Sequence, residues 1–133
     1  MRILRSSAGY IVLVIIILSM AGCASVHVTS KASKQLFEIG MASYYAHKFH
    51  GRATASGEIY DENSLTGAHR MLPFGTLVRV TNLNNNRSVV LKVNDRCPTD
   101  NNRIIDVSFK AAQQLDFVQA GIVKVSVVVV ERN

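Results

Sequence analysis

The chain has 133 residues, 48% of them apolar, and a formal net charge of +6. This length suits one globular domain and excludes two domains of ordinary size. Basic residues are scattered singly, without a basic helix or an aromatic-interleaved basic stretch, so we expect no nucleic-acid partner. Dispersed positive charge suits a surface beside anionic neighbours such as cell-wall polymer or lipid headgroups.

The first 22 residues have the pattern of a targeting segment. Arg2 and Arg5 form a positive start, and the apolar run 10–18 has the length of a signal-peptide core. The order Met-Ala-Gly-Cys at 20–23 resembles the lipobox of bacterial lipoproteins, in which cleavage leaves Cys23 as the lipid-modified first residue. We therefore expect a lipoprotein signal peptide at 1–22. The competing interpretation is an uncleaved transmembrane anchor.

Lipidation of Cys23 implies a location in the cell envelope. Acyl chains would hold the protein on a membrane surface. Ala24, in place of an aspartate after the cysteine, resembles lipoproteins sent on to the outer membrane, so we expect an outer-membrane anchor facing the periplasm of a Gram-negative bacterium. Residues 23–38 are rich in Ser, Lys and Ala and predict a tether, followed by one domain at 39–133.

From Gly40 onward the apolar residues recur with a period of two. Alternation over 77–82 and 88–94 predicts two strands. The Asn-rich segment 83–86 between them predicts a hairpin, because Asn tolerates the left-handed conformation of tight turns. Asp95 has the parity of the inward residues of the second strand, so we expect its carboxylate at the rim of the interior if the strand continues.

The C-terminal third predicts two more strands and a helix. A short strand covers 103–107, and Ser108 is placed to cap a helix over 109–115. Asp106 is a second candidate for that cap. Four alternating valines in 122–130 predict the last strand. Short strands with a single helix indicate an all-β fold, and a small closed barrel leaves no exposed edge.

Several ordered motifs occur in residues 40–130. They are Gly40-Met41-Ala42-Ser43-Tyr44-Tyr45, Phe49-His50-Gly51-Arg52-Ala53-Thr54-Ala55-Ser56-Gly57-Glu58, Ala68-His69-Arg70-Met71-Leu72-Pro73-Phe74-Gly75-Thr76, Val78-Arg79-Val80-Thr81-Asn82-Leu83 and Asn94-Asp95-Arg96. Together these motifs resemble the rare lipoprotein A family. The resemblance implies a six-stranded double-psi β-barrel with one or two short helices, a fold also found in expansins.

The resemblance further implies a lytic transglycosylase that cleaves peptidoglycan glycan strands. Such an enzyme prefers strands without stem peptides and leaves 1,6-anhydro-muramic ends. Glycan strands are then the main partner, with cell-division proteins as candidate further partners. Many relatives add a C-terminal glycan-binding repeat domain, and we expect none in this chain, which puts septal recruitment in doubt. The alternative function is a non-catalytic, expansin-like peptidoglycan-binding lipoprotein.

Cleavage of a glycosidic bond needs an acid that protonates the leaving oxygen. A muramic C6 hydroxyl that attacks its own anomeric carbon has the advantage of intramolecular reaction, so one carboxyl can suffice. Asp95 is our first candidate, because its equivalent in the family lies in the substrate groove and its place after an apolar strand could desolvate it. Alternatively, Asp95 caps the following loop through backbone N–H groups.

Three further residues complete the candidate catalytic set. The resemblance makes Glu58 and Asp61 substrate-binding or catalytic-support residues; otherwise they are solvated loop acids. His69 is a candidate for orienting a carboxylate or binding the sugar, and equally for a structural histidine. Together with Asp95 these residues favour catalysis over binding alone.

Substrate contacts are expected from Ser43, Tyr44 and Arg96. Adjacent Tyr44 and Tyr45 could line a sugar groove, although alternation places one of them in the core. Arg96 could hold the lactyl carboxylate of a muramic residue or pair with a neighbouring acid.

Two other types of site have weaker support. Cys97 with His69 could form a thiol endopeptidase. In the family a glycine commonly follows the Asp-Arg pair, so Cys97 indicates a buried thiol, an intermolecular disulfide or a strained turn. His47 and His50 suggest a metal site but lack a clear third ligand. We expect neither a metal nor a cofactor.

Overall fold

The computed structural model describes residues 37–98 and 102–132. The expected signal peptide, the lipidation site Cys23 and most of the tether lie outside the described residues. No helix in the described part is both long and apolar enough to span a membrane. Its elements are β1 (Phe37–Tyr44), η1 (His47–Phe49), β2 (Thr66–His69), β3 (Leu77–Asn82), β4 (Ser88–Asp95), β5 (Arg103–Val107), α2 (Phe109–Gln114) and β6 (Val123–Glu131).

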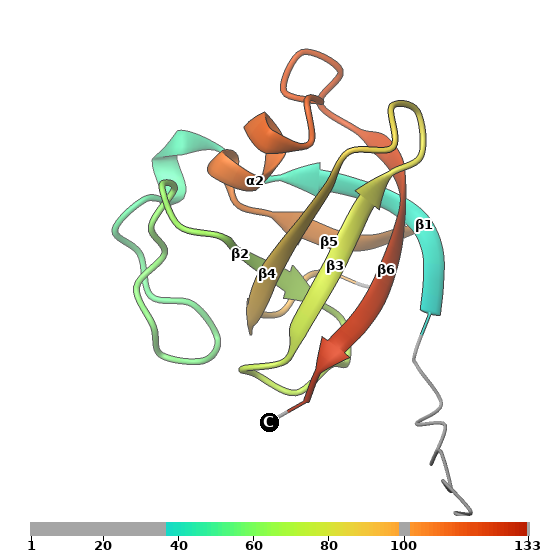
Figure 1. The fold of residues 1–133 in the computed structure, drawn as a ribbon. Coiled ribbons are helices and arrows are strands. Elements are labelled where there is room, and N and C mark those ends of the chain that lie inside the picture. Colours follow the sequence, from blue (N-terminus) through green and yellow to red (C-terminus); the bar gives the residue numbers. More distant parts are fainter. Residues whose placement is uncertain (1–36, 99–101, 133) are drawn as a thin grey trace, which may run out of the picture. The chain divides into compact units, whose positions relative to one another are not determined.

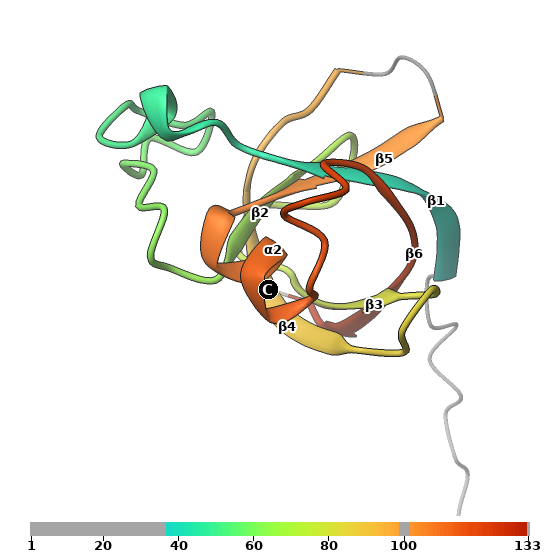
Figure 2. The same ribbon diagram turned by 90° about the horizontal axis from the view of Figure 1, so that it is seen from above.

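The six strands form a closed barrel in the order β1-β5-β2-β4-β3-β6, and β6 pairs with β1 to complete it (Figures 1 and 2). The pairs β1/β5 and β2/β4 are parallel and the others antiparallel. Parallel neighbours cannot be joined by hairpins, so the chain must cross over to build them. The predicted all-β closed barrel is confirmed.

Most predicted elements are present within one residue of their expected ends. β3 and β5 have the predicted bounds, β4 extends one residue further to Asp95, and β6 is shifted by one residue. Asn86 adopts φ 60° in the hairpin turn, as expected of a left-handed Asn. The short strand β2 was not predicted, because all four of its residues are buried and show no alternation.

Ser108 caps α2 as predicted: its Oγ accepts a hydrogen bond from the backbone N–H of Ala111 at 3.3 Å. The expectation that Asp106 caps this helix is wrong. Its carboxylate instead accepts a hydrogen bond from Ser43 Oγ and lies 2.9 Å from the Nε of Arg103. Asp106 is therefore part of the surface of β1 and β5 and not of the helix terminus.

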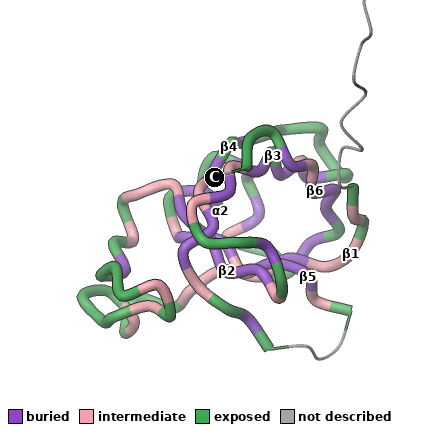
Figure 3. The backbone as a smooth tube through the Cα atoms, turned by 90° about the horizontal axis from the view of Figure 1, so that it is seen from below, coloured by how far each residue is buried: buried purple, intermediate pink, exposed green. Residues whose placement is uncertain are grey.

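The core consists of the inward-facing residues of the strands together with α2. Figure 3 shows the buried residues concentrated along the strands and the exposed ones mainly in the connecting loops. All four valines predicted for the inner face of β6 are buried, which confirms that alternation. The largest fully buried apolar side chains are Leu91, Ile105, Leu115, Val78, Val80, Val93, Val107 and Val125.

Alternation on β4 gives a matched pair of stability variants. Leu91 is 1% exposed, whereas its neighbour Val90 is 40% exposed. Leu91→Ala leaves a cavity in the core and should lower the free energy of unfolding by about 2–5 kcal/mol. Val90→Ala removes surface contacts only and should change it by about 0.5 kcal/mol. Urea denaturation followed by circular dichroism measures both, and equal losses would contradict this assignment of faces.

Candidate active site

The register of the barrel brings three polar side chains into one row on its outer face. Ser43 pairs with Asp106, Asp106 pairs with Ala68, and Ala68 pairs with Asp95. Residues paired across neighbouring strands point to the same side of a sheet. Ser43, Asp106 and Asp95 therefore share one face across β1, β5, β2 and β4. They line a pocket of about 550 Å³.

Asp95 reaches this row through a register shift between β2 and β4. Gly67 pairs with Val93, but the next residue, Ala68, pairs with Asp95, so Asn94 is an extra residue on β4. An extra residue reverses the parity of the side chains that follow it. Val93 is fully buried inside the barrel, whereas Asp95 lines the outer pocket. The expectation that Asp95 continues the inward row of β4 is therefore wrong.

Three donors hold the Asp95 carboxylate. Its Oδ1 accepts hydrogen bonds from the backbone N–H groups of Ala55 and Arg96, each at 2.8 Å. Its Oδ2 accepts one from the Tyr45 hydroxyl at 2.6 Å. The carboxylate thus accepts backbone amides, as a loop-capping group does, and also lines a pocket. The bond from Ala55 joins the segment before Glu58 to the end of β4.

Sequence reasoning considered Tyr45 only as a groove-lining residue and missed its contact with the Asp95 carboxylate. Its ring lies 4.5 Å from that of Tyr60 and 6.0 Å from that of Phe49, measured between centroids. Burial, and after it the Asp95 carboxylate, raises the pKa of Tyr45 far above its ordinary value of 10.0. Tyr45 therefore stays protonated and donates to Asp95. The tyrosine pair was the available signal, but only the strand register shows which of the two faces the acid.

Tyr44 occupies the opposite face of β1 from Ser43. It pairs with Val107, which is fully buried, and its ring packs against Phe109 and Phe117 at centroid distances of 5.9 and 5.7 Å. Its hydroxyl donates a 3.0 Å hydrogen bond to the carbonyl of Val118. Tyr44 is thus the member of the tyrosine pair that packs against the core, and it also belongs to the lining of the Asp95 pocket.

Arg96 is an exposed cation at the Asp95 pocket. Its guanidinium lies 4.1 Å from the centroid of the Phe74 ring, a cation–π geometry. Its Nη1 donates to the carbonyls of His69 and Asp95, each at 3.4 Å. Among the residues that the structure describes, no carboxylate forms an ion pair with it. Lys48 and Arg103 also line this pocket, so three cations surround Asp95 and Asp106.

Glu58 lies close to the end of β4 but is held as an ion. Its Oε1 accepts from Lys92 Nζ at 2.9 Å and its Oε2 from Asn94 Nδ2 at 3.3 Å. These two bonds, led by the one from Lys92, hold the pKa of the carboxyl below its ordinary value of 4.5. An ionised carboxylate has no proton to donate, so this geometry suits Glu58 for positioning and not for acid catalysis.

Asp61 uses its carboxylate within its own turn. Oδ1 accepts from the backbone N–H of Asn63 at 2.9 Å, and Oδ2 accepts from the Ser64 hydroxyl at 3.0 Å. These bonds, the backbone one first, lower the pKa of Asp61. The structure does not bring the described side chain of Asp61 into hydrogen-bond contact with Asp95, and its geometry is that of a turn-stabilising acid.

Both ring nitrogens of His69 bind the protein. Nδ1 accepts from the backbone N–H groups of Met71 and Leu72, each at 3.1 Å, so the ring proton lies on Nε2. Nε2 then donates to Glu38 Oε2 at 2.6 Å. His69 is 2% exposed and lies on the inner face of β2, adjacent to the outward position of Ala68. This arrangement matches the structural alternative for His69.

Cys97 does not form a catalytic pair. The thiol is free and buried, its Sγ lies 3.8 Å from the carbonyl oxygen of Ile104, and burial raises its pKa to about 11. A reactive thiol needs a lowered pKa and an adjacent base, whereas the nitrogens of His69 are occupied. The thiol endopeptidase hypothesis is therefore wrong. Cys97 is also absent from the described residues with positive φ, so the expected strain is not present, whereas the buried thiol is confirmed.

His47 and His50 lie around Glu62. His47 Nδ1 is hydrogen-bonded to the Glu62 carboxylate, and His50 Nδ1 accepts from the Glu62 backbone N–H at 3.2 Å. His50 Nδ1 also lies 3.9 Å from Asp61 Oδ1. Within residues 37–98 and 102–132, no cluster of His, Cys, Asp or Glu side chains has a geometry that could hold a metal ion.

Solved structures with the same fold include two of different kinds. The Streptomyces papain inhibitor superposes with a TM-score of 0.59 at 24% identity, covering 72% of this chain and 96% of the inhibitor. An expansin of Clavibacter michiganensis gives a TM-score of 0.58 at 20% identity, covering 74% of this chain and 52% of the expansin. Identities this low establish the fold alone. The fold is the double-psi β-barrel expected from the sequence.

Sequence relatives are closer. A Treponema pallidum protein is 57% identical over 88 residues, covering 66% of this chain and 28% of the relative. A Campylobacter jejuni protein named endolytic peptidoglycan transglycosylase RlpA is 55% identical over 82 residues, covering 62% of this chain and 30% of the relative. A Vibrio cholerae protein of the same name is 48% identical over 100 residues, covering 75% of this chain and 38% of the relative.

The chain thus spans less than two fifths of the length of these relatives. A family model described as lytic transglycolase matches residues 38–127, which is more than half of the chain and almost the whole barrel. The chain belongs to the rare lipoprotein A family of lytic transglycolase domains.

Proposed function

We propose that this chain is a peptidoglycan lytic transglycosylase in which Asp95 is the catalytic acid and base. The observation that carries the proposal is Asp95 itself, a carboxylate aimed into an open pocket by a register shift and fixed by three donors. Relatives named endolytic peptidoglycan transglycosylase support the substrate and the reaction class.

The proposed reaction needs one carboxyl and no protein nucleophile. Protonated Asp95 gives its proton to the glycosidic oxygen while the bond from that oxygen to the muramic C1 breaks. The C6 hydroxyl of the same muramic residue then forms the new bond to C1, and its proton returns to Asp95. Proton and bonds balance, no water is consumed, and the product carries a 1,6-anhydro end. The intramolecular attack replaces the second carboxylate of a hydrolase.

The two oxygens of Asp95 have different tasks in this proposal. Oδ1 accepts both backbone N–H groups, so Oδ2 is the oxygen left to carry the transferable proton. The Tyr45 hydroxyl, 2.6 Å from Oδ2, fixes the direction in which that proton points. Because the pKa of Tyr45 is raised far above neutrality, Tyr45 orients Asp95 and does not itself take up a proton.

The cations of the pocket support the preference for strands without stem peptides. Removal of the stem peptide leaves the lactyl carboxylate of a muramic residue free and negatively charged. Lys48, Arg96 and Arg103 line the same pocket as Asp95 and supply the positive charge that attracts it. In a strand that keeps its peptides this carboxylate is an amide, and the ionic attraction is lost.

We also propose the cellular setting that the N-terminal sequence suggests. Acylation at Cys23 would anchor the domain at the outer membrane on the periplasmic side, within reach of the peptidoglycan layer. Cell-division proteins are candidate partners in this setting.

A binder that does not cleave is the second candidate. It is favoured by the occupied side chains of Asp61 and His69, which leave Asp95 without a second catalytic group, and by the expansin-like fold. In that case the same groove would hold glycan strands without breaking them.

Asp95→Asn should abolish the release of fragments from peptide-stripped peptidoglycan, because an amide cannot deliver the proton. The assay incubates the full chain with the substrate and weighs the products, which should be one water lighter than hydrolysis products. Asp116→Asn is the matched control, since Asp116 is exposed and has φ 56°, which Asn tolerates. No release by the unsubstituted chain, with retained binding to sacculi, would establish the binder.

Tyr45→Phe should keep the stacking on Tyr60 but remove the hydrogen bond to Asp95 Oδ2. We expect kcat to fall by about tenfold to a hundredfold with little change in KM, because misplacement of a catalytic group lowers the rate of the chemical step. Steady-state kinetics on stripped glycan strands separates the two constants. A rise in KM at constant kcat would show that Tyr45 binds substrate and does not orient the acid.

Glu58→Gln should lower kcat/KM without moving the acidic limb of its pH profile. The pKa of Glu58 lies below 4.5, so its carboxylate is already ionised across pH 5–8 and cannot produce a limb there. The pH profiles of the unsubstituted chain and the variant test this, with exposed Glu131→Gln as control. A limb that shifts only in Glu58→Gln would make Glu58, and not Asp95, the proton donor.

A further inference from the structure

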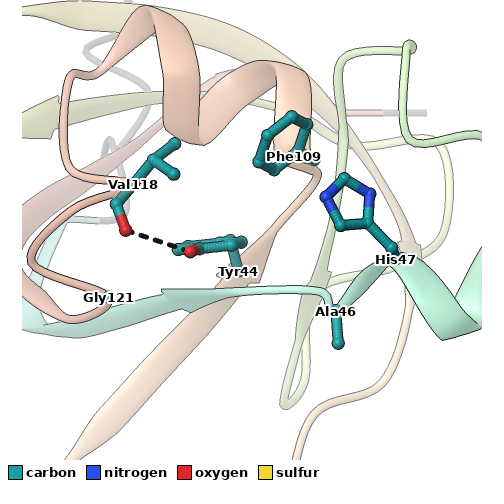
Figure 4. A pocket seen from close by; sticks show the side chains of 6 residues that line it. All are labelled: Tyr44, Ala46, His47, Phe109, Val118 and Gly121. Atoms are coloured by element: carbon teal, nitrogen blue, oxygen red, sulfur yellow. Dashed lines mark hydrogen bonds between the residues drawn. The ribbon is translucent and has the colours of Figure 1, made fainter.

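A second pocket, of about 560 Å³, adjoins the Asp95 pocket along the end of β1. Tyr44 and Ala46 belong to the lining of both pockets, so the two pockets are neighbours at the end of β1. In Figure 4 Tyr44 lies in the middle, with Phe109 and His47 on one side and Val118 and Gly121 on the other. The volume falls within the range of about 300–1,000 Å³ typical of small-molecule sites.

Two rings of this pocket are held in place but remain accessible. The His47 ring lies 4.7 Å from the Phe109 ring, and its Nδ1 is fixed by the Glu62 carboxylate. The His47 side chain is still 70% exposed. No described residue bonds its Nε2, which is free to bind a ligand. Accessible aromatic rings with one open polar atom suit the face of a sugar ring and one of its hydroxyl groups.

The two pockets differ in charge. The Asp95 pocket contains the cations Lys48, Arg96 and Arg103 and the carboxylates Asp95 and Asp106, whereas the described lining of the second pocket contains neither a Lys or Arg side chain nor a carboxylate. Its polar atoms include Val118 O and Tyr44 Oη, which are hydrogen-bonded to each other. The sugars of a peptidoglycan strand also alternate between charged and uncharged, because the muramic residue carries a lactyl carboxylate and the glucosamine residue does not.

We infer that the second pocket is a saccharide subsite for the uncharged N-acetylglucosamine residue that adjoins the muramic residue at Asp95. This inference rests on the proposed function, from which it takes the occupant of the first pocket. The shared wall at Tyr44 and Ala46 lets one strand lie in both pockets at once. When two consecutive sugars are bound, the glycosidic bonds that join them to each other and to the next sugar have fixed positions relative to Asp95.

The test measures binding in an Asp95→Asn background, in which the strand is not cleaved. The full chain is titrated with N-acetylmuramic acid and with a peptide-free tetrasaccharide of alternating N-acetylglucosamine and N-acetylmuramic acid. His47→Ala should weaken tetrasaccharide binding about tenfold, through loss of one stacked ring and one hydrogen bond, and leave the monosaccharide unchanged. Phe109→Leu, which removes the ring but keeps most of the volume, should give the same selective loss.

Gln113→Ala is the control, because Gln113 is exposed on α2 and lines neither pocket. Thermal unfolding of each variant shows that it is folded. The subsite would be overturned if the variants weakened the binding of both ligands equally, or weakened the binding of neither. It would also be overturned if the loss of binding appeared only with a tetrasaccharide that keeps its stem peptides. Failure of the proposed function is separate, since it appears as absence of anhydro products from the unsubstituted chain while the selective loss of binding persists.

Discussion

The register shift between β2 and β4 is the constraint on which the site depends. Without this shift, regular side-chain alternation along β4 would place Asp95 on the buried side with Val93, two residues before it. A lone carboxylate there would face the apolar core, where an unpaired charge is very costly. The shift places it on the outer face, in line with Ser43 and Asp106 and within reach of Tyr45. The register shift thus makes Asp95 an accessible carboxylate of the outer pocket and keeps it out of the apolar core.

Close packing at Gly67 accompanies this shift. A Cβ at Gly67 would lie 3.0 Å from Leu91 Cδ1 and 3.1 Å from the carbonyl oxygen of Asp106. Both neighbours belong to the strands that flank β2, so the absence of a side chain lets β4 and β5 approach it closely. Gly40 has the corresponding place on β1, where a Cβ would lie 2.5 Å from Ile104 Cγ2 on β5. Glycines therefore lie in both parallel pairs of the barrel, beside the strands that carry the polar row.

The acids around the site divide into fixed and available groups. Glu38 is bound by His69 and Arg70, Glu58 by Lys92 and Asn94, and Asp61 by its own turn. In each case the partners favour the ionised form or occupy the oxygens. Asp95 also accepts from three donors, but unlike these three acids it lines the open pocket. This place in the pocket, more than the number of hydrogen-bond partners, distinguishes the candidate catalytic acid from Glu38, Glu58 and Asp61.

The barrel class, the β3/β4 hairpin, the Ser108 cap, the alternating valines of β6 and Asp95 as the principal candidate could all be predicted from the sequence. These features depend on local periodicity, turn chemistry and ordered motifs, which act over a few residues. The face of Asp95, the division between Tyr44 and Tyr45, the bond of His69 to Glu38 and the role of Asp106 could be read only from the folded barrel. Each of these depends on how segments tens of residues apart are aligned, and a shift of one residue there reverses which side chains meet.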